Sequence, residues 1–215
     1  MQNGKYKAVV FDLDGTAVDS RYNLEALQRT CVAMIGREAT EEELKLSYGM
    51  TAQNSIRYFG IPDDQAERFE QLWIENIMEL AKNAQLFEGI YPAMCRMKEA
   101  GILLGVNTSR TSREMGDLEH YIKEPFLQLC STIVTCDKVA RPKPAPDSML
   151  YFLQQHQLQP SEVLFVGDSE FDAGCAKAAG CDFALAVWGC FYPDTIDATY
   201  KPNHPDELLR IVGLA

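Results

Sequence analysis

Apolar and polar positions divide the chain into two kinds of region. Residues 6–11 (YKAVVF) form an apolar run rich in β-branched side chains, which predicts a buried strand. From about residue 19 to residue 85 no such run occurs, and helix formers dominate. Apolar residues spaced by three and four within 63–82 are typical of one helix face. A capping box at Thr40 and the segment 51–59 predict two more helices, so this stretch is expected to be an all-helical insert.

After Gly89 the pattern alternates between short apolar runs and amphipathic stretches. This alternation predicts a parallel sheet with helices on both faces. The predicted class is α/β, with a Rossmann-like core formed by 1–18 and 86–215 and an all-helical insert at 19–85. Strands are expected at 102–107, 132–135, 163–166 and 183–187, and helices at 91–100, 111–121, 146–156, 170–179 and 205–212.

Composition and charge narrow the possible partners. With 47% hydrophobic and 24% charged residues the chain is typical of soluble globular proteins, and no apolar run reaches the roughly 20 residues of a membrane span. A net charge of −11 disfavours binding to nucleic acid or to an anionic membrane. The seven cysteines include no C-x-x-C pair, and no secretory signal is visible. We therefore expect the thiols to be reduced and the protein to be cytoplasmic. It is expected to be a monomer or a homodimer.

The first polar motif, DLDGT, follows the first predicted strand. Asp12 and Asp14 are two residues apart, so in an extended segment both carboxylates face one side. They then lie at the carboxyl end of a sheet, where open α/β folds bind ligands. An ordinary Asx-rich turn produces the same letters, and the pattern alone does not decide between the two.

Three further motifs follow later strands. Thr108 and Ser109 either hold a phosphoryl oxygen or cap a helix. Lys143 lies in a loop stiffened by three prolines, where it either neutralises charge or is solvated. Asp168 and Asp172, four apart at a helix start, either face one site or stabilise the helix dipole. Each motif is weak alone, but all four end predicted strands.

The order DLDGT, NTSR, KPAP, GDSEFD resembles the haloacid dehalogenase superfamily, in the subgroup with a helical cap inserted after the first strand. The resemblance covers nearly the whole chain. In cap type and length it is most similar to phosphoglycolate phosphatases. It implies an active site between cap and core, joints near 19–22 and 85–89, and a cis peptide bond after Lys143.

The resemblance also implies roles for the aspartates. Asp12 would attack phosphorus and form an aspartyl-phosphate, and Asp14 would act as general acid and then as general base. Mg²⁺ would be held by the carboxylates of Asp12 and Asp168 and the backbone carbonyl of Asp14. Asp172 would hold metal-bound waters or the lysine in place.

The same resemblance implies a phosphate cradle. Thr108 and Lys143 would bind the phosphoryl group and take part in catalysis. The backbone amides of Leu13 and Ser109 would complete this cradle. The expected activity is Mg²⁺-dependent hydrolysis of a small phosphorylated metabolite similar to phosphoglycolate.

Several relatives of this superfamily remain as alternatives. A sugar-phosphate mutase similar to β-phosphoglucomutase places an arginine three residues after a cap glycine; here Gly49 is followed by Ala52, which disfavours that activity. A pyrophosphatase or a broad sugar phosphatase carries the same four motifs. Dehalogenases lack the second motif aspartate, and phosphonatases need a cap lysine that residues 17–36 do not contain. A non-catalytic binding protein is disfavoured because no motif residue is missing.

Overall fold

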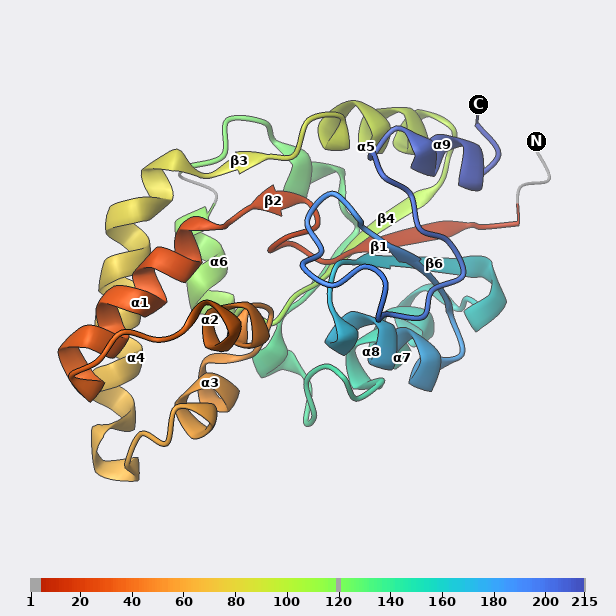
Figure 1. Cartoon of the computed structure of the whole chain (residues 1–215). Helices are drawn as coiled ribbons and strands as arrows, with labels where there is room; N and C mark the ends of the chain where they lie inside the picture. The colour runs from red at the N-terminus through yellow and green to blue at the C-terminus, as the bar shows by residue number, and fades with distance from the viewer. Residues whose placement is uncertain (1–4, 119–120, 215) are drawn as a thin grey trace.

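The computed structural model describes residues 5–118 and 121–214 and contains a parallel five-stranded sheet (Figure 1). The strand order is β5-β4-β1-β6-β7, so β1 lies in the middle between β4 and β6. Phe11 at the end of β1 is level with Val106 of β4 and Val166 of β6. The strands are β1 (Ala8–Phe11), β4 (Leu103–Asn107), β5 (Thr132–Val134), β6 (Val163–Gly167) and β7 (Asp182–Leu185).

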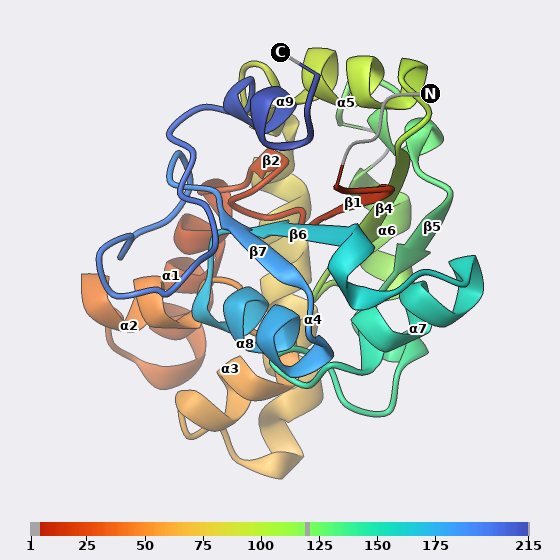
Figure 2. The ribbon, with the colours of Figure 1, turned by 90° about the vertical axis from the view of Figure 1, so that its right-hand side faces the viewer.

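Helices cover both faces of this sheet, as Figure 2 shows. All four residues of β1 are fully buried because alternate side chains enter two different core clusters. Val9 and Phe11 pack with α5 and α9, whereas Ala8 and Val10 pack with α7 and α8. The helices of the core are α5 (Ile90–Glu99), α6 (Ser112–Leu118), α7 (Asp147–His156), α8 (Glu170–Ala179) and α9 (Glu207–Ile211).

A separate group of helices stands beside the carboxyl end of the sheet (Figure 1). It consists of α1 (Tyr22–Ile35), α2 (Glu41–Ser47), α3 (Ala52–Tyr58) and α4 (Asp63–Leu80), which we call the cap. The cap has its own small core, which includes Leu27, Ile56 and Phe69. Thr40 begins α2 with the expected capping box. Two short antiparallel strands, β2 (Val18–Asp19) and β3 (Gln85–Leu86), lie where the chain enters and leaves the cap.

The predicted α/β class with a parallel sheet is confirmed. The helix expected over 111–121 is α6, and residues 119–120 of that range lie outside the described residues. The β2–β3 pair was not expected, because two residues per strand are too few to show an alternating pattern. The Lys143–Pro144 peptide bond is cis, as the resemblance implied. Within residues 5–118 and 121–214 the structure also has four short 3₁₀ helices: η1 (Ala81–Asn83), η2 (Phe126–Leu129), η3 (Cys136–Lys138) and η4 (Pro160–Glu162).

Two further sequence expectations can be compared with the structure. All seven cysteines are free thiols. Within the described part of the chain, no helix combines the length and the apolar character that crossing a bilayer requires.

Candidate active site

The carboxyl ends of three neighbouring strands bring the predicted residues together. Asp12 directly follows β1, and its backbone N–H donates to the carbonyl of Val166 at 2.8 Å. Thr108 follows β4 and Asp168 follows β6, the two strands on either side of β1. Parallel pairing therefore places residues that are about 100 and 150 positions apart at one edge of the sheet.

Lys143 lies beneath this edge between two carboxylates. Its Nζ donates to Oδ1 of Asp12 at 2.7 Å and to Oδ1 of Asp172 at 2.6 Å. The lysine is only 5% exposed. Burial alone would lower the pKa of Lys143, but Asp12 and Asp172 outweigh it and raise the pKa above its usual value. The lysine is thus a buried cation fixed in contact with Asp12.

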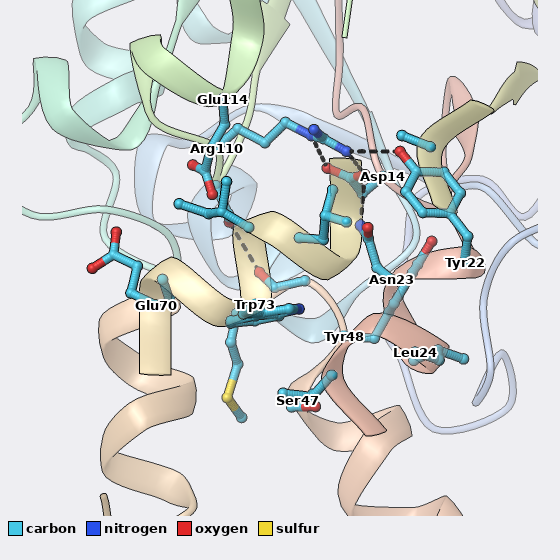
Figure 3. Close-up of a pocket in the computed structure, with 18 of the residues that line it drawn as sticks. Asp14, Tyr22, Asn23, Leu24, Ser47, Tyr48, Glu70, Trp73, Arg110 and Glu114 are labelled. Carbon is cyan, nitrogen blue, oxygen red and sulfur yellow. Dashed lines mark hydrogen bonds and ion pairs between the residues drawn. The ribbon is translucent and has the colours of Figure 1, made fainter. Parts of the chain in front are cut away.

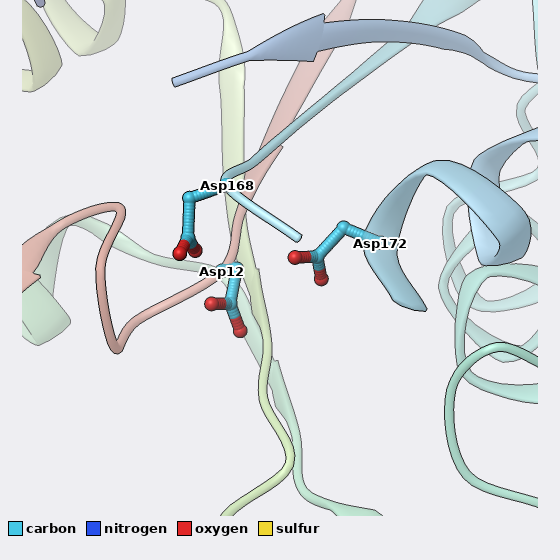
Figure 4. A group of neighbouring side chains, drawn as sticks. All are labelled: Asp12, Asp168 and Asp172. Carbon is cyan, nitrogen blue, oxygen red and sulfur yellow. The ribbon is translucent and has the colours of Figure 1, made fainter. Parts of the chain in front are cut away.

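Three buried carboxylates surround this single cation. One oxygen from each of Asp12, Asp168 and Asp172 lies within 4.8 Å of the others (Figure 4). Burial raises the pKa of Asp12 to about 7, although Lys143 opposes the shift. Burial, followed by repulsion from Asp12 and Asp172, raises the pKa of Asp168 well above its usual range. Three ionised carboxylates would exceed the charge of one lysine, so the cluster is suited to a divalent cation with oxygen ligands.

The three aspartates differ in how many of their oxygens are already used. Asp172 accepts from Lys143 at Oδ1, and at Oδ2 from the backbone N–H and the hydroxyl of Ser169. Asp168 accepts from the hydroxyl of Thr16 at Oδ1, at 2.9 Å. Asp172 is thus committed to holding the lysine, whereas Asp12 and Asp168 are better placed to bind a metal.

The loop after β1 approaches Asp168 closely because of a glycine. Gly15 has φ +82°, and a Cβ there would lie 2.3 Å from Oδ2 of Asp168. The loop closes on the carbonyl of Leu13, which accepts from the N–H groups of Ala17 at 2.9 Å and Val18 at 2.8 Å. A residue with a side chain at position 15 would displace the Asp168 carboxylate or the loop.

The residues predicted to cradle phosphate lie beside Asp12 but also contact other groups. Thr108 is 2% exposed, and its hydroxyl accepts from the backbone N–H of Arg110 at 3.1 Å. Ser109 donates its hydroxyl to the carbonyl of Gly49 in the cap at 2.9 Å. The segment after β4 therefore joins the catalytic edge to the cap.

Asp14 forms a buried ion pair that the sequence motifs did not reveal (Figure 3). Arg110 donates from Nε to Oδ2 of Asp14 at 2.7 Å and from Nη2 to Oδ1 at 2.6 Å. Asn23 of the cap adds a 3.3 Å hydrogen bond to Oδ1, and Tyr22 lies beside the guanidinium. Burial alone would raise the pKa of Asp14, but Arg110 holds it below its usual value. A basic residue two positions after Thr108 was the available signal.

A cavity between cap and core opens onto Asp12 and Asp14 (Figure 3). Two polar atoms of its lining residues, Oδ1 of Asn23 and Nε1 of Trp73, are buried and have no hydrogen-bond partner among the described residues. Buried polar atoms are usually satisfied by protein, water or ligand, so this wall is incomplete without an occupant. Most of the cap wall is apolar or aromatic, from Tyr22, Leu24, Leu27, Met50, Trp73, Ile74, Ile77 and Met78.

Comparison with known proteins agrees with this geometry. Residues 9–186 match the family model described as haloacid dehalogenase-like hydrolase. The chain belongs to this family. Membership makes it a hydrolase and accounts for the order of its four motifs along the chain.

Named relatives of this hydrolase cover most of its length. The N-acetylmuramic acid 6-phosphate phosphatase of Pseudomonas aeruginosa is 26% identical over 230 residues, which span 100% of this chain and 98% of the relative. Phosphoglycolate phosphatase 1 of the same organism is 28% identical over 192 residues, spanning 85% of this chain and 70% of the relative.

Solved structures share the complete architecture. A hydrolase of subfamily IA, variant 1, from Geobacter sulfurreducens has a TM-score of 0.73 and 27% identity, and the match covers 99% of both chains. A crystal structure from Lactobacillus plantarum has a TM-score of 0.87 at 24% identity, covering 96% of this chain and 99% of that one. The second match shows the fold, including the cap.

Proposed function

We propose that this hydrolase is a Mg²⁺-dependent phosphatase that removes phosphate from a small phosphomonoester through an aspartyl-phosphate on Asp12. One observation carries the proposal. The Asp12 carboxylate is fixed at the end of β1 against Lys143, beside Asp168, and faces the cavity between cap and core. A carboxylate held in this way is suited to nucleophilic attack on a bound phosphoryl group.

The proposed reaction has two steps. In the first, a carboxylate oxygen of Asp12 bonds to phosphorus, the ester P–O bond breaks, and Asp14 gives its proton to the leaving oxygen. In the second, Asp14 takes a proton from water, the water oxygen bonds to phosphorus, and the bond to Asp12 breaks. Lys143 and Thr108 hold the phosphoryl oxygens, with the backbone amides of Leu13 and Ser109. The enzyme ends as it began, with inorganic phosphate released.

The carboxylate cluster fits Mg²⁺ within this proposal. The side chains of Asp12 and Asp168, with the backbone carbonyl of Asp14, would hold the ion, and Asp172 would keep Lys143 in place. When bound, Mg²⁺ supplies positive charge that attracts the dianionic phosphate and stabilises charge on its oxygens. The close approach of three buried carboxylates, whose ionised forms one lysine would not balance, supports this assignment.

The substrate belongs to the class of small phosphorylated metabolites, and the reaction is placed in the cytoplasm. The names of the relatives make phosphoglycolate the reference compound and N-acetylmuramic acid 6-phosphate the second. A phosphosugar mutase is less well supported. A mutase of this kind binds the second phosphate of its substrate with an arginine of the cap. In this chain Ala52 lines the cavity at the matching position, so that arginine is missing there.

The proposal is tested by phosphate release from p-nitrophenyl phosphate and phosphoglycolate, with Mg²⁺ and with a chelator. Chelation is expected to abolish release and added Mg²⁺ to restore it. Asp12→Asn keeps the size of the side chain but removes the nucleophile, so a loss of at least about 10⁴-fold in kcat is expected. Asp64→Asn, at an exposed carboxylate of α4 outside the cavity lining, is the matched control and should stay within about threefold. Equal activity with and without metal, or an active Asp12→Asn enzyme, would contradict the proposal.

A further inference from the structure

The pair between Arg110 and Asp14 conflicts with the role proposed for Asp14. The guanidinium forms a two-pronged contact, with one N–H group on each carboxylate oxygen. Asn23 also donates to Oδ1. Three of the roughly four acceptor positions of this carboxylate are therefore taken, and the leaving oxygen of a substrate has to approach the same two oxygens. Substrate binding thus competes with the contact between Asp14 and Arg110.

Separating Asp14 from Arg110 is unfavourable unless another anion takes the place of the Asp14 carboxylate. The Arg110 side chain is only 11% exposed, so an unpaired guanidinium would be a largely buried charge. Breaking a buried ion pair is strongly unfavourable when one charge is left uncompensated. Some other anion has to take the place of Asp14 beside Arg110.

Two glutamates line the same cavity, and neither is placed to replace Asp14. Glu70 lies well away from the guanidinium (Figure 3). Glu114 lines the same cavity, but its Oε2 already accepts from the N–H of Thr111 at 2.6 Å and from its hydroxyl at 2.7 Å. Tyr22, the other polar group at the guanidinium, is a neutral phenol. Arg110 is also the one cation among the described lining residues of the cavity. An anion on the substrate fits this position best.

We propose that Arg110 exchanges Asp14 for a carboxylate on the leaving group of the substrate, and that this exchange frees Asp14 to reach the ester oxygen. The inference rests on the phosphatase function proposed above. A carboxylate matches the group it replaces in charge and in planar shape, so the forked guanidinium can bind it with both N–H groups. Arg110 is then a specificity residue of the reaction.

The position of the carboxylate follows from the contact between Arg110 and Asp14. When Asp14 contacts the ester oxygen, the guanidinium is its immediate neighbour. The substrate carboxylate therefore belongs on the carbon that bears the ester oxygen. The predicted class is a 2-phosphooxy carboxylate, and the apolar cap wall leaves space for a larger substituent on that carbon.

If Arg110 binds the phosphoryl group instead of a substrate carboxylate, a different dependence of activity on Arg110 is expected. If Arg110 left Asp14 to bind the transferring phosphoryl group, every phosphomonoester would depend on it equally. If it binds a carboxylate of the leaving group, only esters that carry this carboxylate depend on it. Substrates that differ only in the carboxylate separate the two roles.

The test compares two matched pairs of esters on wild type with Mg²⁺: phosphoglycolate against ethyl phosphate, and 2-phosphoglycerate against glycerol 2-phosphate. For at least one pair the carboxylate ester should have a kcat/KM at least about 100-fold higher. p-Nitrophenyl phosphate, whose leaving group needs no proton, is the reference. Arg110→Gln should lose about 100-fold more kcat/KM on the preferred carboxylate ester than on the reference. Arg110→Lys should recover only part of the loss, because an ammonium cannot make the forked contact.

Four other results would contradict either the role of Arg110 or the phosphatase function. Equal losses on all esters in Arg110→Gln would place the guanidinium on the phosphoryl group. No carboxylate preference in either pair would reject the exchange from wild-type data alone, even if the variant does not fold. Faster hydrolysis of ethylene glycol bisphosphate than of either carboxylate ester would assign Arg110 to a second phosphate instead. Failure to hydrolyse any ester, the reference included, would reject the phosphatase function itself.

Discussion

The sheet side and the cap side of the active site are built differently. On the sheet side, Asp12, Lys143 and Asp168 are each 5% exposed; Lys143 donates to Asp12 at 2.7 Å, and Asp168 accepts from the hydroxyl of Thr16 at 2.9 Å. On the cap side, Asn23 and Trp73 are partly exposed, and each has a buried polar atom without a partner among the described residues. The groups proposed to do the chemistry are therefore held in place by the protein itself, whereas these two polar atoms of the cap are not.

Contacts between the cap and the core differ in how exposed they are. Tyr192 of the core donates its hydroxyl to Oε2 of Glu42 in α2 at 3.0 Å, in an exposed position. The ring of Phe191 meets the buried Tyr48 edge-on with centroids 5.3 Å apart. An exposed hydrogen bond such as that of Tyr192 costs little to break.

The largest effect that distinguishes the two sides is expected at Lys143. Lys143→Met leaves Asp12 and Asp172 buried without their cation. With metal removed by a chelator, the free energy of unfolding should fall by about 3–5 kcal/mol, measured by urea denaturation. Phosphatase activity should also be lost, because the phosphoryl group loses its fixed positive partner.

Two variants control this prediction. Lys7→Met removes an exposed lysine that pairs with Glu162, and it should change the free energy of unfolding by less than about 1 kcal/mol. Adding Asp172→Asn to Lys143→Met removes one of the stranded charges and should recover part of the lost stability. A Lys143→Met protein as stable as wild type would show that the sheet side is not held by this ion pair.

A small effect is expected at the contact between cap and core. Tyr192→Phe removes only the hydroxyl that donates to Glu42. Because the bond is exposed, kcat/KM for p-nitrophenyl phosphate should change by less than about threefold. Tyr58→Phe, at an exposed tyrosine of the cap, is the matched control. A loss above about 100-fold in Tyr192→Phe alone would mean that this contact is part of the catalytic machinery.

Sequence reasoning placed the sheet side well for a physical reason. Asp12, Thr108 and Asp168 each follow a short apolar run, and parallel strands end at the same edge of a sheet. Periodicity thus predicts that these residues meet, although it does not give the distances. The roles assigned to them remain proposals.

The cap side could not be predicted to the same extent. The Arg110–Asp14 pair joins residues 96 positions apart, and no periodic pattern connects a loop after β4 with a loop after β1. Trp73 belongs to the apolar helix face predicted within 63–82, a pattern that indicates packing. It does pack edge-on against Phe69, with centroids 6.2 Å apart, but it also lines the cavity. A helix face that serves both purposes has the same sequence pattern as one that only packs.

The central claim, covalent catalysis by Asp12, is tested most directly by trapping the phosphorylated enzyme. Wild type is mixed with Mg²⁺ and the best substrate, quenched in acid within one turnover, and treated with borohydride, which reduces an acyl phosphate but not a free carboxylate. Peptide mass spectrometry should then find homoserine at position 12, and none without substrate. Reduction at another carboxylate, such as Asp168, or no reduction while phosphate is being released, would contradict the account.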